Sequence, residues 1–110
     1  MRVIRAGGTV IKDPDAEEVF QFDWGTGTIG PEQHLAPGVL IATSLFFIIG
    51  VDSLMTKDNE GIVMPQARAT QLRLKAGTEL VKYKVTNRIV TNEPIPQTKD
   101  VSFYVLIRQR

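Results

Sequence analysis

Two segments near the end of the chain alternate between apolar and polar residues, and this alternation constrains the fold more than any other feature. Residues 80–91 place on one face Val81, Tyr83, Val85 and Ile89. Residues 101–108 place on one face Val101, Phe103, Val105 and Ile107. A period of two over this length is typical of a half-buried β-strand. Both segments are therefore predicted to be strands, with Phe103 in the core.

The residues between these two strands, 92–100, include Pro94 and Pro96. Proline has no N–H group to donate to a ladder, so neither strand can easily continue through Pro96. The pair is expected to form an antiparallel hairpin with a long, semi-rigid loop. A stiff loop loses little entropy on binding, so this one suits a protruding contact arm.

An aromatic segment earlier in the chain shows the same period. Phe20, Phe22 and Trp24 fall on one face of residues 18–24, with polar residues between them. Large rings dominate core burial, so these three side chains are predicted to be core. Alternation at Thr70, Leu72 and Leu74 predicts a further strand within 67–75.

The remaining segments are read from their turns and apolar runs. Gly7 and Gly8 interrupt residues 3–11 and indicate a bulge, or a first strand that switches between two sheets. Residues 12–15 are expected to turn, with aspartates bonding nearby backbone N–H groups. The run 39–49 is too continuous for a one-sided strand, so either both faces are covered or the outer face packs on another subunit. The polar stretch 52–61 is expected to be a solvated turn.

Composition bounds the class of protein. The chain has 110 residues with 43% apolar content, which predicts a single globular domain over 1–110. Its 13 basic and 12 acidic residues leave a net charge of +1, which argues against nucleic-acid binding driven by charge. No secretory signal is evident, since glycines, Thr9 and Lys12 interrupt any apolar stretch near Met1. The longest apolar run, 39–51, is shorter than the ~20 residues that span a bilayer, so no membrane partner is expected.

No segment of the sequence predicts catalysis, a metal site or a cofactor. The glycine-rich stretch 25–31 lacks the Gly-Lys-Ser/Thr sequence of a phosphate-binding loop. His34 is the only histidine and the chain has no cysteine, which makes a poor nucleus for a metal site. Residues 52–61 lack the ligand spacing of a calcium loop. The acidic residues near the start have no histidine nearby in sequence, so an enzyme is not expected.

The predicted elements together indicate an all-β fold, namely an antiparallel immunoglobulin-like β-sandwich of about seven strands. Leu72 and Leu74 lie on one predicted strand, Gly77 in the following corner, and Tyr83 near the start of the next strand. That is the order of an immunoglobulin tyrosine corner, in which the phenol bonds upstream backbone. We therefore expect Tyr83 to be buried, with its hydroxyl bonded to backbone near residues 77–79.

The order of several short motifs resembles a group of small immunoglobulin-like virion structural proteins of tailed bacteriophages. The motifs are Lys12-Asp13-Pro14-Asp15-Ala16, Phe22-Asp23-Trp24, Gly77-Thr78, Tyr83-Lys84-Val85-Thr86, Ile89-Val90-Thr91 and Asp100-Val101-Ser102. The match covers about half of the chain. The usual serine after Asp-Trp is Gly25 here, and residues 31–66 depart from the pattern.

The resemblance implies a non-enzymatic virion protein, made in the host cytoplasm and docked by surface contacts on the capsid as a head decoration, cement or head-fibre component. The alternatives are a head-tail junction or tail component, and a carbohydrate- or protein-binding module. The expected partners are capsid or other virion proteins and further copies of the same chain. Apolar residues opposite the predicted core, together with the loop prolines, are the candidate interface: Val90, Tyr104, Leu106, Pro94 and Pro96.

Overall fold

The structure is a computed structural model that describes residues 2–4, 7–24, 35, 38–64 and 66–109. The predicted glycine loop at 25–31 and His34 lie outside these residues. The described part contains eight strands and no helix. The strands are β1 Arg2–Ile4, β2 Thr9–Lys12, β3 Glu17–Asp23, β4 Ile41–Ile49, β5 Met55–Ile62, β6 Ala69–Ala76, β7 Lys82–Thr91 and β8 Thr98–Ile107.

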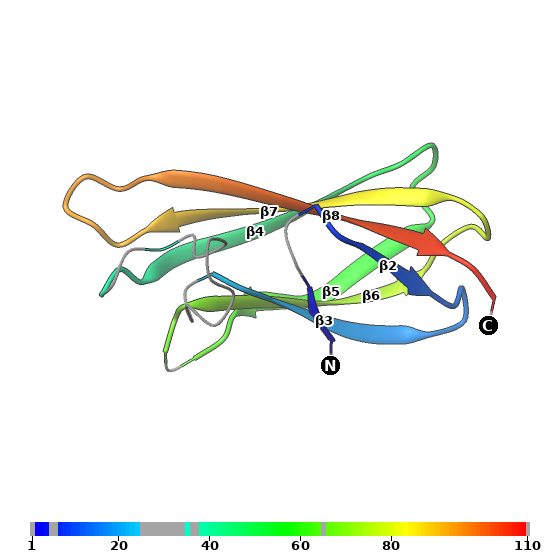
Figure 1. The fold of residues 1–110 in the computed structure, drawn as a ribbon, viewed down its shortest axis with the longest axis horizontal. Coiled ribbons are helices and arrows are strands. Elements are labelled where there is room, and N and C mark those ends of the chain that lie inside the picture. The colour runs from blue at the N-terminus through cyan, green and yellow to red at the C-terminus, as the bar shows by residue number, and fades with distance from the viewer. Residues whose placement is uncertain (1, 5–6, 25–34, 36–37, 65, 110) are drawn as a thin grey trace.

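The strands form two four-stranded sheets packed face to face (Figure 1). Sheet I has the order β1-β3-β6-β5 and sheet II the order β2-β8-β7-β4. All neighbours are antiparallel except β1 with β3 and β2 with β8. This is the strand order of an immunoglobulin-type sandwich whose first strand is split between the two sheets. The predicted all-β sandwich is thus confirmed, and of the two alternatives left open at Gly7–Gly8, a bulge or a switch between sheets, the strand order supports the switch.

The predicted hairpin is the centre of sheet II. β7 pairs with β8 from Lys82 opposite Leu106 to Val90 opposite Thr98. One face of each strand is buried in strict alternation, including Val85 and Val105. The loop that joins the strands extends beyond the sheet at one end of the molecule (Figure 1). The sandwich is elongated, with principal dimensions of 43 × 24 × 22 Å.

Apolar side chains from both sheets fill the space between them. Phe20 of β3 and Phe103 of β8 meet across the sandwich with ring centroids 6.1 Å apart. Phe22 packs edge-on against Trp24 at 5.0 Å, and both are buried. Aromatic pairs in these arrangements add a little to the stability gained from burying their area.

A hydrogen-bonded polar cluster crosses this core. Asn87 Oδ1 accepts bonds from the Trp24 indole N–H at 2.9 Å and from the Thr70 hydroxyl at 2.7 Å. Asn87 Nδ2 donates to Ser44 Oγ at 2.9 Å and to the Leu45 carbonyl at 3.1 Å. Trp24 and Thr70 come from the side of sheet I, whereas Asn87 and Ser44 belong to sheet II. The cluster therefore links the two sheets, and its bonds offset the cost of burying polar groups.

The predicted solvated turn at 52–61 is wrong, because most of it is the edge strand β5. Its charges are paired along the sheet: the Arg73 guanidinium donates to both oxygens of Asp58, at 2.8 and 2.7 Å, and Lys75 Nζ lies 3.1 Å from the same carboxylate. A bulge between Asp58 and Gly61 places Asn59 at a φ of 50°. A polar edge strand with a bulge looks like a turn in sequence because it lacks an apolar alternation.

Lys12 closes β2 and does not lie in the turn that was expected to include it. Its side chain is buried, and its Nζ donates to the carbonyls of Asp13 at 2.9 Å and Ala76 at 2.8 Å. Burial lowers the pKa of Lys12, while nearby Glu18 and Asp13 act in the opposite direction. In the turn itself, Asp13 accepts a bond from the Asp15 N–H at 2.9 Å, as predicted.

Candidate functional site

The most distinctive surface lies on the outer face of sheet II. Because residues alternate along a strand, the core takes one set of side chains from β4, β7 and β8 and leaves the other set on the outside. The register aligns the outer set in rows across the sheet: Leu45 opposite Arg88 and Asp100, Phe47 opposite Thr86 and Ser102, and Ile49 opposite Lys84 and Tyr104. An edge strand, a central strand and the next strand therefore contribute to one surface.

The outer side of β4 is apolar and open. Leu45 is 48% exposed and Ile49 58% exposed, with Phe47 half-buried between them. β4 is the last strand of sheet II, and no described strand pairs with its outer edge. The continuous apolar run 39–49 was compatible with two alternatives, a strand covered on both faces or an outer face packed on another subunit. Within the described part of the chain, Leu45 and Ile49 both stay about half exposed, so the chain itself does not fully cover this outer face.

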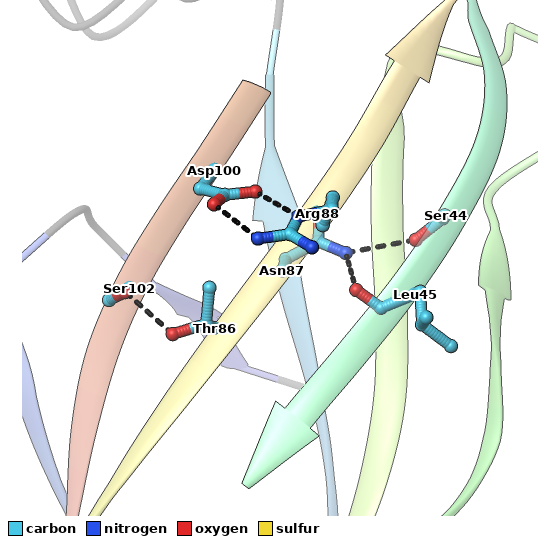
Figure 2. A network of polar contacts seen from close by, with 7 residues as sticks. All are labelled: Ser44, Leu45, Thr86, Asn87, Arg88, Asp100 and Ser102. Atoms are coloured by element: carbon cyan, nitrogen blue, oxygen red, sulfur yellow. Dashed lines mark hydrogen bonds and ion pairs between the residues drawn. The ribbon is translucent and has the colours of Figure 1, made fainter. Parts of the chain in front are cut away.

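The centre of the same face is polar and internally bonded, as Figure 2 shows. Arg88 donates from Nε and Nη2 to the two oxygens of Asp100, at 2.9 and 3.0 Å. These bonds lower the pKa of Asp100 below its ordinary value. The hydroxyls of Thr86 and Ser102 bond each other at 2.8 Å, and the Arg88 guanidinium lies 5.3 Å from the centre of the Phe47 ring. The central side chains are thus held in fixed positions before any partner arrives.

Between the apolar strand and the polar centre lies an open hollow of about 640 Å³, here called the basic hollow. Its lining comes from residues 47–49 of β4 and from Lys84, Thr86, Arg88, Asp100 and Ser102. Lys84 is exposed and its ammonium has no ion-pair or hydrogen-bond partner among the described residues. The hollow therefore offers apolar surface, hydroxyl groups and a free cation within one concave patch.

The predicted interface residues do not form one patch. Tyr104 and Leu106 lie on this outer face and are half-buried, with Lys82 Nζ 4.8 Å above the Tyr104 ring. Val90 is in a separate row, opposite Thr98, beyond the Arg88–Asp100 pair.

Pro94 and Pro96 are exposed in the protruding loop. Leu45, Phe47 and Ile49 were not predicted as individual site residues, although the continuous apolar run 39–49 carried the signal.

Tyr83 lies at the corner between β6 and β7 and is fully buried. The Thr78 N–H donates to its hydroxyl at 3.0 Å, within the backbone expected from the corner pattern. The hydroxyl in turn donates to Asp52 Oδ1 at 2.6 Å, a contact that sequence reasoning missed. Phe20, Phe22, Trp24 and Phe103 are core side chains and none of them reaches the outer face.

The described residues contain no group of three or more acidic, histidine or cysteine side chains able to hold a metal ion. Within the same residues there is also no helix long and apolar enough to cross a membrane. What the outer face of sheet II presents is contact area with fixed polar groups, which is the usual composition of a protein-binding surface.

Comparison with known protein families finds a match over most of the chain. The model of a family described as "Podophage GP4 fiber-tail adaptor protein gp77" matches residues 12–106. No curated protein and no solved structure matches the chain. The matched range begins at the last residue of β2 and ends within β8, so it covers β3 to β7 and most of β8 and leaves out β1.

Proposed function

Because the chain belongs to the Gp77 family of podophage fiber-tail adaptor proteins, we propose that it joins a fibre to the tail of a podophage particle by surface contacts. At the coarser level it is a bacteriophage structural protein that is associated with the tail and contacts other virion proteins. The family match over residues 12–106 is the observation that carries the proposal. It favours the tail or head-tail junction alternative over the head decoration, cement or head-fibre role expected first.

The shape of the molecule suits an adaptor. The sandwich is 43 Å long and about half as wide. The proline-containing loop lies at one end, and the Tyr83 corner lies at the other with the turn after β2 (Figure 1). Two distant ends and a broad outer face allow one small chain to contact two neighbours at once. Such a role needs contact area and rigidity and no catalysis.

Two further points belong to this proposal. We expect several copies to assemble in the particle after synthesis in the host cytoplasm, because the net charge of +1 opposes close packing only weakly. The resemblance to small immunoglobulin-like virion structural proteins of tailed phages stays a prediction.

The test is a phage that carries an amber mutation in this chain, grown on a host without a suppressor. The purified particles should have filled heads and tails but lack fibres when their proteins are quantified by mass spectrometry and their tails are imaged by cryo-electron microscopy. Adding the purified chain, followed by fibre protein, should restore the fibres. Particles that keep a full set of fibres without the chain would refute the adaptor role.

A further inference from the structure

We propose that the basic hollow is the surface by which this chain docks on its neighbour in the tail, and that the neighbour presents carboxylates beside aliphatic side chains. The inference rests on the adaptor role and adds to it the face that is used and the chemistry of the partner.

One edge of the hollow is apolar. Single exposed apolar residues are normal on a protein surface and need no explanation. Here Leu45, Phe47 and Ile49 follow each other at every second position of one strand, so they form a continuous apolar line. This line lies at the rim of a concavity, where a partner's side chains can be buried on more than one side. Such surfaces are typical of protein interaction sites.

The face that carries the hollow has a surplus of positive charge. The outer face of sheet II carries three cations, Lys82, Lys84 and Arg88, against the single carboxylate of Asp100 on its described strands. Arg88 is neutralised by Asp100 and Lys82 lies over the Tyr104 ring, so Lys84 is the cation available to a partner. On the outer face of sheet I, by contrast, Arg73 and Lys75 are both paired with Asp58. The surplus positive charge is thus a property of one face and predicts an acidic partner.

The charge also decides between possible occupants. Two copies of the chain facing each other through their hollows would bring like charges together, which is unfavourable where water is excluded. A nucleic acid would need a broad basic surface, and a chain with a net charge of +1 does not supply one. A protein segment with carboxylates next to aliphatic groups satisfies Lys84 and covers Leu45 and Ile49 at the same time.

The polar side chains in the floor of the hollow are already hydrogen-bonded to one another. The Arg88–Asp100 pair and the Thr86–Ser102 pair fix four side chains that would otherwise lose rotamer freedom when a partner binds. The hydroxyl pair and the second lone pairs of the Asp100 oxygens remain able to bond a partner's backbone. A prepared polar floor with an apolar rim and one free cation fits an extended protein segment better than a flat surface would.

The experiment uses amber-mutant particles, which lack this chain, as the binding probe. Purified chain is mixed with these particles, the particles are sedimented, and the bound chain is quantified over a range of concentrations. Lys84→Glu reverses the free cation and Ile49→Asp places a charge in the apolar line. Arg108→Glu is the matched control, because it makes the same change of charge at an exposed position beyond β8. If Lys84→Glu shows no cooperative thermal unfolding transition, and is therefore not folded, Lys84→Gln replaces it in the binding experiment.

Both hollow variants are expected to bind the particles about tenfold or more weakly, whereas Arg108→Glu should bind as the wild type does. Raising the salt from about 50 mM to about 500 mM should weaken wild-type binding, because salt screens the attraction between Lys84 and the partner's carboxylates. The same change should affect Lys84→Gln less, since this variant lacks that attraction.

The possible failures are distinguishable. If the wild type does not bind the particles at all, the adaptor role is wrong and the docking proposal fails with it. If the wild type binds and both hollow variants bind equally well, the adaptor role stands and the docking face is wrong. Loss of binding with Ile49→Asp alone, without any salt dependence, would refute the acidic partner. If the wild type forms oligomers and either hollow variant is monomeric, the occupant of the hollow is a second copy of the chain and the proposal is wrong.

Discussion

The hydroxyl of Tyr83 donates a 2.6 Å hydrogen bond to Oδ1 of Asp52, which lies in the loop between β4 and β5. The same carboxylate accepts bonds from the Leu54 N–H at 3.0 Å and, through Oδ2, from the Thr78 hydroxyl at 2.7 Å. The corner that precedes β7 is thus tied to the loop that crosses from sheet II to sheet I. These hydrogen bonds lower the pKa of Asp52 below its ordinary value of 3.8, and the bond from Tyr83 has the largest effect.

Replacing Tyr83 by Phe should lower the free energy of unfolding by about 1–2 kcal/mol, because it removes a buried hydroxyl and leaves the Thr78 N–H without its acceptor. The pKa of Asp52 should rise toward its ordinary value, which can be followed by NMR titration. Urea unfolding measures the first effect. Tyr104→Phe is the control, since its ring packs under Lys82 and no hydroxyl bond is lost. Equal unfolding midpoints for the two variants would contradict the corner.

The polar cluster at Asn87 predicts a second loss of stability. Asn87→Leu keeps the approximate volume but removes the acceptor of the Thr70 hydroxyl and the amide that donates to the Ser44 hydroxyl, at a cost of about 1–3 kcal/mol. The Trp24 fluorescence should be blue-shifted and poorly quenched by iodide in the wild type, because its ring is buried.

A double-mutant cycle of Asn87→Leu with Trp24→Phe should show coupling between the two positions, since they share a hydrogen bond. Strictly additive effects would mean that the indole bond contributes nothing.

Acid stability should depend on Asp58. Arg73 and Lys75 hold its pKa at about 2, below the ordinary value of 3.8. Because the pKa is lowered on folding, the stabilisation is complete above pH 3.8 and is lost as the pH falls from 3.8 to about 2. Asp58→Asn should therefore show a shallower loss of stability over that interval in chemical unfolding. Asp15→Asn, which removes the same charge from the exposed turn, should retain the wild-type profile. If both variants follow the wild-type curve, Asp58 is not a determinant of acid stability.

Self-association is expected to involve the β8 side of the outer face. Tyr104→Asp or Leu106→Asp should weaken it while the monomer stays folded, because each variant places a charge where a stable interface of at least about 1,000 Å² would exclude water. Light scattering measures the mass and circular dichroism the fold. Gln109→Asp adds the same charge outside β8 and should have no effect. If both β8 variants still form oligomers, Tyr104 and Leu106 are not part of the interface.

The sequence was sufficient to predict strands that have one buried face and one solvent-exposed face. Period-two alternation predicted β3, β6, β7 and β8, because the pattern of burial and the pattern of hydrophobicity coincide there. Gly7 and Gly8 indicated an irregularity in the first strand, either a bulge or a switch between sheets, but did not decide between the two. The order of Gly77 and Tyr83 predicted the place of the corner.

The sequence was insufficient where a contact depends on a distant partner. β5 is rich in charge, and only pairing with Arg73 and Lys75 of β6 makes its charges compatible with a strand. Lys12 was expected in a turn because it directly precedes Asp13 and Pro14, which favour turn initiation, yet two carbonyl acceptors hold its ammonium inside the protein. The bond from Tyr83 to Asp52 spans 31 positions in the chain, and nothing local to either residue signals it.

The candidate surface was predicted only in part for a similar reason. The apolar run in β4 was noticed, but the strand that lies beside it and the register of the pairing were needed to place Ile49 next to Lys84. Val90 and Tyr104 both occupy outward-facing positions on neighbouring strands, yet the register of the pairing separates them along the sheet. The alternation along a strand predicts the face of the sheet on which a residue lies, whereas the register between strands decides which residues are its neighbours.

The parallel pairing of β2 with β8 has a mechanical consequence. Thr9 pairs with Tyr104 and Lys12 with Ile107, so the chain enters β2 at one end of this pair and leaves β8 at the other. A pulling force between the segment before Thr9 and the segment after Ile107 therefore acts along the strands. The bonds that join them, such as Tyr104 N–H to Gly8 and Arg108 N–H to Lys12, would be loaded together in shear and could not open one after another. A link that must withstand tension between two bodies gains strength from that geometry without any additional contact.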